Sequence, residues 1–335
     1  MKERVLDANF PRTADHRVYH LGLRAGEIAN RIVTVGSESR ARTIASFLDK
    51  TPEPFKLSSE RGFITITGRY SGVPVSIVSV GMGSPNVDFF IREARECLSG
   101  DMVVIRLGSC GCLTDLPVGS IVIPKASVAV NRNYDFDFVT GKSQEYPYRI
   151  SKPVSANFDL HLAVNIAISF LRQHVDTYTS FYSSQGRQTS FPDHNADLIE
   201  HLQSSINDLA TLEMETFHIF HLATSWQGNF NSFKTVSPPL ATSPVHPYIS
   251  QPPSTQDPPP DLSSSVGEHA TSKPRIKAAA AQMVFASRLS QDFITPEQVT
   301  ELENWCARGM LGALRGFEIG LESLHPELGS VWEVK

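Results

Sequence analysis

Apolar positions follow two different periods along the first part of the chain. Runs with the length and composition of buried strands stand at 32–36, 63–70, 73–80, 102–107 and 120–124. Residues 40–48 instead place their apolar side chains at helical spacing. The second and third runs are joined by Ser71-Gly72, which indicates paired strands with a tight turn. This alternation predicts a single α/β domain, with a central mixed β-sheet flanked by helices on both sides in three layers.

Three further helices are predicted from start signals or periodicity. Ser84 can cap a helix whose first position is Pro85. Residues 158–171 form a strongly periodic apolar pattern. Thr295 can cap the last helix, and Gln298 then completes a capping box.

One long segment interrupts the regular pattern. Nine of the 22 prolines fall between positions 238 and 260, among many Ser and Thr residues and few large apolar ones. Such a composition buries too little apolar surface to offset the entropy of ordering, so we expect a disordered insertion at 227–273. It is either a genuine loop or a mistranslated intron. The predicted organisation is thus a flexible segment at 1–17 and a domain at 18–325 that carries this insertion.

Composition excludes several classes of function. A net charge of -5 offers no electrostatic footprint for nucleic acid or an anionic membrane. The four cysteines form no C-x-x-C pair, so we expect no metal site. Gly81-Met82-Gly83 lacks the third glycine and the distal acid of a dinucleotide-binding loop. With no apolar run of 18 residues and no signal core in 1–17, we expect a cytoplasmic protein.

Three arginines stand at or near predicted strand ends and are candidates for binding an anion. They are Arg40, Arg61 and Arg106. An arginine inside an apolar strand, such as Arg106, is costly unless an anion meets it. The Gly-Ser-Cys-Gly sequence at 108–111 adds backbone N–H groups and the Ser109 hydroxyl. A phosphate cradle is one interpretation; an internal ion pair with a carboxylate for each arginine is the other.

The run Glu213-Met214-Glu215 precedes an apolar helical pattern that starts at Phe217. Acids in this position suit the positive end of the helix dipole, which is the simple interpretation. A carboxylate also accepts two hydroxyl protons at once, as the vicinal diol of a ribose requires. The run is therefore either a helix start or a sugar-binding element.

Gln185 and Arg187 form a third candidate cluster. Two residues apart on an extended segment, their side chains would point the same way. Glutamine offers an acceptor and donors, and arginine offers donors only, which matches the carbonyl and N–H groups of a uracil edge. An ordinary surface loop is the alternative.

Together these segments resemble the nucleoside phosphorylase family, in particular its uridine phosphorylase branch. The motifs that carry the resemblance are residues 19–23, 36–40, 106–109, 181–187 and 212–216, in this order and spacing. The resemblance extends from residue 18 to about 317, apart from the insertion. It implies reversible phosphorolysis of uridine to uracil and ribose 1-phosphate in pyrimidine nucleoside salvage, with inorganic phosphate as co-substrate and no cofactor.

The resemblance also implies roles for individual residues. Phosphate would be held by Gly36, Arg40, Arg106 and Ser109, together with Arg61 of a neighbouring subunit. The ribose would be held by Glu213, Met214 and Glu215, together with His20 of that neighbour. The base would be held by Phe181, Gln185, Arg187 and Arg288. Arg187, Gln185 and Arg106 would act in catalysis, and the shared residues imply a dimer or a hexamer.

The sequence departs from the family at several positions. The first phosphate loop, 36–40, lacks the usual Asp and Pro, with Ser37 in place of the Asp. Gly62 follows Arg61, where bacterial relatives place a glutamate that binds potassium, so we predict no such ion. Purine-specific relatives place an Asp next to the position of Arg288, and its absence argues against a purine. The alternatives are a phosphorylase of thymidine, deoxyuridine or a purine nucleoside, and a catalytically idle nucleoside-binding module.

Overall fold

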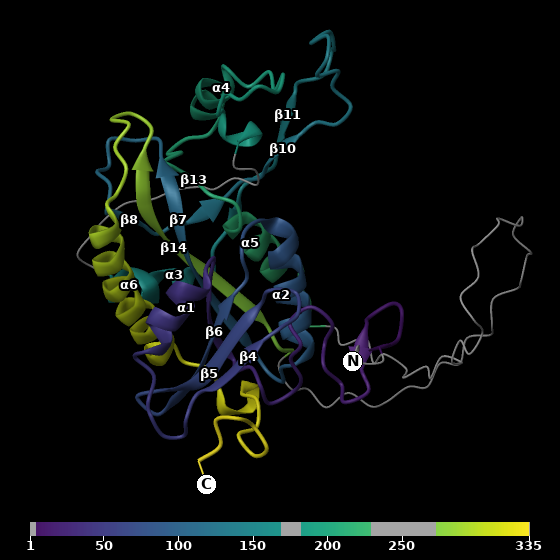
Figure 1. Ribbon diagram of the computed structural model, residues 1–335, viewed down its shortest axis with the longest axis vertical. Helices are drawn as coiled ribbons and strands as arrows, with labels where there is room; N and C mark the ends of the chain where they lie inside the picture. Colours follow the sequence, from purple (N-terminus) through teal and green to yellow (C-terminus); the bar gives the residue numbers. More distant parts are fainter. Residues whose placement is uncertain (1–4, 169–181, 229–272, 335) are drawn as a thin grey trace, which may run out of the picture.

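The computed structural model describes residues 5–168, 182–228 and 273–334 (Figure 1). Its main sheet runs in the order β4-β5-β6-β3-β7-β14-β8, and β13 pairs with β7. The strands are β3 (Arg31–Val35), β4 (Phe55–Ser58), β5 (Ile64–Tyr70), β6 (Val73–Ser79), β7 (Met102–Cys112), β8 (Ile121–Val122), β13 (Thr211–Leu212) and β14 (Ile276–Ser287). The strands β6, β3, β7 and β14 are parallel, and the outer pairings are antiparallel.

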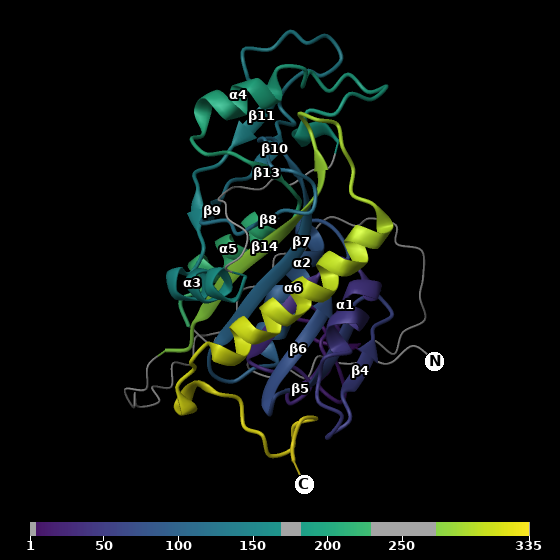
Figure 2. The ribbon, with the colours of Figure 1, turned by 90° about the vertical axis from the view of Figure 1, so that its left-hand side faces the viewer.

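Helices cover both faces of this sheet, as Figures 1 and 2 show. The helices are α1 (Glu38–Ala45), α2 (Ser84–Glu96), α3 (Phe158–Ala167), α4 (Leu198–Ser205), α5 (Thr216–Ser225) and α6 (Pro296–Gly316). One core cluster joins α1, α3 and α6 to the sheet, and a second joins α2 and α5 to its other face. The predicted three-layer α/β fold with a mixed sheet is confirmed.

Smaller elements complete the described chain. Three short antiparallel pairs are β1 (Val5–Leu6) with β2 (Arg12–Thr13), β9 (Ala126–Ser127) with β12 (Val154–Ser155), and β10 (Val130–Arg132) with β11 (Tyr148–Ile150). Two 3₁₀ turns are η1 (Ser183–Gln185) and η2 (Leu321–Ser323). In Figure 1, β10, β11 and α4 form a projection at one end of the sheet.

Several local predictions are confirmed and others are wrong. The strands β5 and β6 pair as expected, and Thr295 and Gln298 form the capping box of α6. The predicted Ser84 cap is wrong, because Gly83 at φ 90° is the residue that precedes α2. β7 does not end at 107, and its glycines continue the strand to Cys112. Within the described residues α3 ends at Ala167, earlier than expected.

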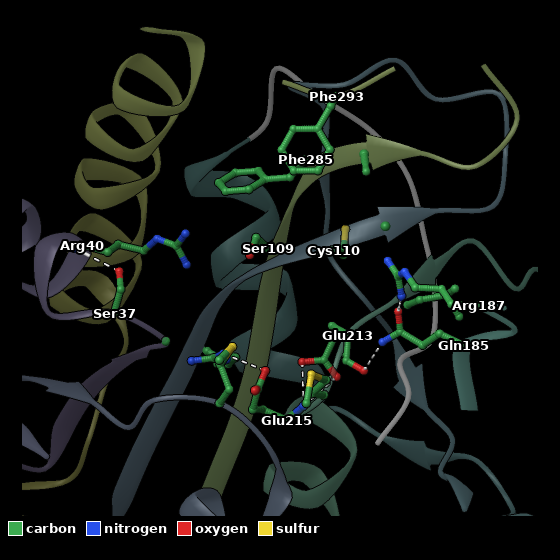
Figure 3. Close-up of a pocket in the computed structure, with 17 residues that line it drawn as sticks. Ser37, Arg40, Ser109, Cys110, Gln185, Arg187, Glu213, Glu215, Phe285 and Phe293 are labelled. Carbon is green, nitrogen blue, oxygen red and sulfur yellow. Dashed lines mark hydrogen bonds and ion pairs between the residues drawn. The ribbon is translucent and has the colours of Figure 1, made fainter. Parts of the chain in front are cut away.

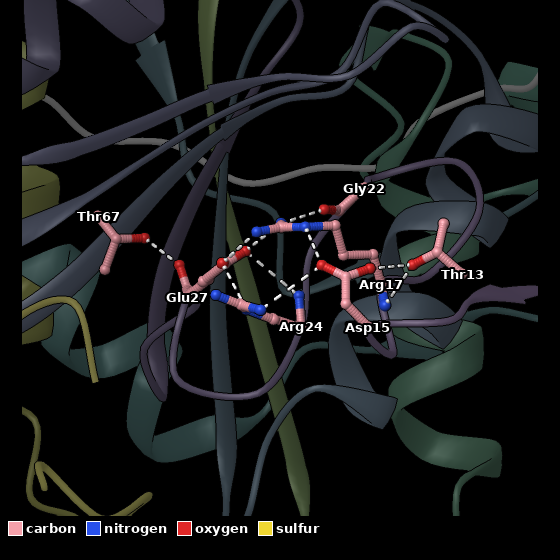
Figure 4. Close-up of polar contacts among 7 residues, drawn as sticks. All are labelled: Thr13, Asp15, Arg17, Gly22, Arg24, Glu27 and Thr67. Carbon is pink, nitrogen blue, oxygen red and sulfur yellow. Dashed lines mark hydrogen bonds and ion pairs between the residues drawn. The ribbon is translucent and has the colours of Figure 1, made fainter. Parts of the chain in front are cut away.

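The segment before the main sheet is tied down by an ion-pair network (Figure 4). Both terminal nitrogens of Arg17 donate to the buried carboxylate of Glu27 at 2.7 Å, and Arg24 Nε donates to the same carboxylate at 3.0 Å. Arg17 Nη1 also donates to the carbonyl of Gly22. These bonds fix the turn at 18–23, which carries Tyr19 and His20.

The predicted insertion lies almost wholly outside the described residues. Its two described ends, however, are adjacent: a Cβ placed on Gly228 would lie 2.9 Å from the Cβ of Lys273. The chain therefore leaves the domain and returns to it at one place. Of the helices that the structure describes, none combines the length and apolar character needed to cross a membrane.

Candidate functional site

A cavity of about 300 Å³ opens where the carboxyl ends of β3, β7 and β14 meet the start of α5 (Figure 3). Ligands in open α/β sheets bind at such an edge. Nine of the predicted site residues line this cavity: Gly36, Arg40, Arg106, Ser109, Gln185, Arg187, Glu213, Met214 and Glu215. Segments far apart in the sequence thus meet around one space.

Arg106, on β7, lines the cavity. Its Nη2 donates to Glu215 Oε2 at 2.7 Å, and both side chains are buried. Within the described residues, Arg106 Nε and Nη1 are buried and have no hydrogen-bond partner. Unpaired buried donors on a cation favour binding of an anion with several acceptor oxygens, such as phosphate. The two interpretations of Arg106, an internal ion pair and an anion site, therefore both apply.

Arg40 approaches the same cavity from the start of α1. Ser37 caps this helix, because its hydroxyl accepts from the Arg40 backbone N–H at 3.3 Å. The Arg40 guanidinium Nε donates to Glu303 Oε1 at 2.8 Å, so this arginine is also paired with a carboxylate. Burial lowers the pKa of Arg40, and the negative charge of Glu303 opposes that shift. The altered loop 36–40 thus still presents a cation to the cavity.

Glu213 and Glu215 use the amino end of α5 in different ways. The Glu213 carboxylate accepts from the backbone N–H groups of Glu215 and Thr216 at 2.9–3.1 Å. Burial, followed by the charge of Glu215, raises the pKa of Glu213 to about 7. Glu215 accepts from Gly83 N at 2.6 Å and from Arg106. Glu213 therefore satisfies the helix start, while Glu215 lines the cavity beside a cation.

Gln185 and Arg187 lie on the opposite wall from Arg40 in Figure 3. The prediction that they share an extended segment is wrong: Gln185 ends the 3₁₀ turn η1, and Gly186 adopts a left-handed conformation at φ 63°. This turn nevertheless brings the side chains together, because Arg187 Nη1 donates to Gln185 Oε1. Gln185 Nε2 also reaches the Glu213 carbonyl at 3.4 Å. The amide is thereby oriented beside the Glu213–Glu215 run.

A buried asparagine holds the two ends of this turn. Asn195 Nδ2 donates to the carbonyls of Ser183 and Arg187 at 2.8 and 3.1 Å. The Tyr148 hydroxyl contacts Ser183 Oγ at 2.6 Å. Burial, followed by the charge of Arg288, lowers the pKa of Arg187. Both guanidinium groups line a second, more open hollow next to the main cavity.

His20 and Arg61 are absent from the described lining of the main cavity. The His20 ring stacks on Phe89, and its Nδ1 lies 2.6 Å from Glu93 Oε1. The Arg61 guanidinium contacts the Tyr19 hydroxyl and lies 4.7 Å from the centre of that ring. Both residues therefore contact Tyr19, and neither is among the described residues that line this chain's own cavity. Phe181 lies outside the described residues.

The cavity is also lined by apolar residues that the sequence analysis did not assign to the site, among them Met82, Phe285, Ala286 and Phe293. Phe285 lies two residues before the end of β14, and the bridge between Ala286 and Phe293 returns the chain over the cavity. Phe293 and Met82 are exposed, which indicates the mouth of the site. The sequence signal for these residues is proximity: Phe285 and Ala286 stand shortly before Arg288, and Phe293 stands shortly after it.

The sequence matches the Phosphorylase superfamily over residues 30–244. The chain belongs to this superfamily. The uridine phosphorylase of Thermococcus kodakarensis is 29% identical over 232 residues, which cover 67% of this chain and 78% of that protein. A DeoD-type purine nucleoside phosphorylase of Brevibacillus brevis is 28% identical over 229 residues, with coverages of 67% and 87%. Sequence similarity within the superfamily therefore includes both pyrimidine and purine enzymes.

Solved structures of the superfamily share the fold. One comes from a study of two diverse uridine phosphorylases in the oomycete Phytophthora capsici. It has a TM-score of 0.75 and 33% identity, and covers 94% of this chain and all of its own. A Trypanosoma brucei nucleoside phosphorylase with uridine phosphorylase activity has a TM-score of 0.66 at 18% identity and covers 92% of this chain and all of its own. At that identity the second likeness concerns the fold alone.

Proposed function

We propose that this protein is a uridine phosphorylase, which converts uridine and phosphate reversibly to uracil and ribose 1-phosphate. The observation that carries this proposal is the contact between Gln185 and Arg187 on the wall next to Glu215 and Arg106. Residues suited to bind a base, a ribose and an anion then follow one another around one cavity. The 33% identity to a protein from the uridine phosphorylase study supports the same choice.

The chemistry requires only that the two reactants are held in line. The bond between the anomeric carbon and uracil N1 breaks, its electron pair stays on the base, and a phosphate oxygen bonds to that carbon. Arg40, Arg106 and Ser109 would hold the phosphate near the developing positive charge on the sugar. Positioning of this kind lowers a barrier by roughly 7–11 kcal/mol. No cofactor is needed, because phosphate is the nucleophile.

The leaving base would be stabilised by donors on Gln185 and Arg187. Negative charge develops on the uracil oxygens as the bond breaks, as in an oxyanion hole. Gln185 can both donate and accept, so it suits the N–H and carbonyl of one base edge. Glu213, Met214 and Glu215 would hold the ribose. Arg288, beside Arg187, would close over the base.

We further propose that the working unit is an oligomer in the cytoplasm, acting in nucleoside salvage. This proposal is supported by the positions of His20 and Arg61, which both contact Tyr19 and are not among the described residues that line their own cavity. Each cavity would then be completed by the Tyr19–His20 turn and Arg61 of a second subunit.

Purine nucleoside phosphorylase is the second candidate, because relatives with that name match at similar identity. The sequence around Arg288 argues against it, because no Asp stands next to this arginine, where purine-specific relatives place the acid that protonates the base. Incubation with phosphate and uridine, and separately with phosphate and inosine, distinguishes the candidates. Release of uracil but not hypoxanthine supports the proposal, whereas the reverse supports the purine enzyme, and no release supports an idle module.

A further inference from the structure

Arg40 and Arg106 each have one carboxylate partner, but the two partners differ in kind. Glu215, the partner of Arg106, is itself part of the cavity wall. Glu303, the partner of Arg40, belongs to α6 and is not among the described residues that line the cavity. Glu303 therefore contacts the arginine from behind, on the side away from a bound ligand.

The hydrogen bonds of Arg40 leave one edge of its guanidinium available. Nε donates to Glu303 Oε1 at 2.8 Å, and Nη1 donates to the Leu107 carbonyl at 3.4 Å. Among the described residues, none accepts a hydrogen bond from Nη2, while the side chain lines the cavity. In Figure 3 the guanidinium extends towards Ser109. Glu303 thus fixes the direction in which the remaining N–H groups of Arg40 point.

The charge of Glu303 also acts on any bound anion. Arg40 and Glu303 are both largely buried, with side-chain exposures of 8% and 13%. Solvent screens such a pair weakly, so the carboxylate repels an anion that contacts Arg40. One contact therefore has two opposite effects on anion binding: the hydrogen bond orients the donor, and the charge weakens the attraction.

We propose that Glu303 is a positioning residue that orients Arg40 and limits the affinity of the site for phosphate. This inference rests on the proposed phosphate site. The limit on affinity serves turnover in both directions, because phosphate and ribose 1-phosphate must each leave a pocket that contains two buried arginines.

Two substitutions separate the hydrogen bond from the charge. Glu303→Gln keeps an oxygen that accepts from Arg40 Nε and removes the charge, so KM for phosphate falls about 5-fold. Glu303→Ala removes both, so Arg40 loses its orientation and KM for phosphate rises about 10-fold. KM for uridine stays unchanged in both variants. Glu301→Gln, an exposed site on the same helix, makes the same chemical change and leaves every constant unchanged.

Calorimetric binding of inorganic phosphate without nucleoside tests the inference apart from catalysis. Tighter binding by Glu303→Gln and weaker binding by Glu303→Ala support it, even if uridine is not the substrate. Changes of phosphate affinity that are equal and in the same direction in both variants, or no change in either variant, overturn the inference. Thermal unfolding verifies that both variants are folded. If the wild-type protein binds phosphate but releases no uracil from uridine, the proposed function is overturned while the inference about Glu303 is not.

Discussion

Arg106 and Glu215 are joined by a 2.7 Å ion pair in the wall of the cavity, with side-chain exposures of only 4% and 6%. The pair connects the proposed phosphate site to the proposed ribose site. Because Arg106 retains two buried N–H donors without a partner in the described chain, it can bind an anion without releasing Glu215. The two substrates would therefore meet on opposite sides of one ion pair.

Removal of one member of this pair leaves a buried charge without compensation. Arg106→Met is expected to lower the free energy of unfolding by about 3–5 kcal/mol. Adding Glu215→Gln to that variant should restore a large part of the loss, because no buried charge then remains unpaired. Urea unfolding of wild type, both single variants and the double variant gives the interaction energy. Strictly additive losses would show that the pair contributes no coupling.

Arg187→Ala is expected to reduce kcat for uridine by about 10²- to 10³-fold, because one donor to the leaving base is lost. Arg187 is half-buried, so the thermal midpoint should change little by comparison. Arg149→Ala removes an exposed arginine that pairs with Asp135, its one ionic partner in the described part of the chain, and serves as the control. Turnover by Arg187→Ala equal to that of wild type would refute its role in base recognition.

The raised pKa of Glu213 makes stability depend on pH. Its pKa is about 7 in the folded protein and near 4.5 in the unfolded chain, so the folded state holds its proton over a wider range. The resulting contribution is present below pH 4.5 and is lost as pH rises through about 7. At 1.36 kcal/mol per unit, the loss is roughly 3 kcal/mol. Glu213→Gln should remove this dependence of the free energy of unfolding on pH, as measured by denaturant unfolding between pH 4.5 and 8. If the dependence on pH is unchanged in this variant, other groups cause it.

Donation of Arg61 between subunits can be tested by mixing two inactive variants. Arg61→Ala lacks the donated group, and Arg106→Ala lacks the receiving cavity. After joint refolding, a mixed dimer has one intact site, so random mixing restores about a quarter of wild-type activity. Activity that remains at the level of the separate variants would contradict sharing of this residue.

The sequence predicted the layers of the fold and nine of the residues that line the cavity, because these depend on local periodicity and on side-chain chemistry within short motifs. It could not predict that Glu303 partners Arg40, since 263 positions separate them and only the packing of α6 brings them together. It also ended β7 too early at Gly108. A Cβ on that glycine would lie 2.1 Å from Gln282 Oε1, so any larger residue there requires the Gln282 side chain to move. A glycine after an apolar run usually indicates the end of a strand, but here the packing of β7 against its neighbours keeps Gly108 inside the strand.

The turn that carries Gln185 and Arg187 shows the same limit. Residue types alone indicated a pair suited to uracil, but not the conformation that joins them. The left-handed Gly186 and the two hydrogen bonds from Asn195 determine that conformation, and Asn195 lies outside every motif used to predict the site.

The central claim is that phosphate is the nucleophile and uridine the nucleoside. The most direct test is the initial rate of uracil release from uridine as phosphate concentration is varied, with inosine and thymidine measured in parallel. The account predicts a rate that rises from near zero to saturation with phosphate, formation of ribose 1-phosphate in equal amount to uracil, and little release from inosine. Uracil release at the same rate without phosphate, or faster phosphorolysis of inosine than of uridine, would contradict it.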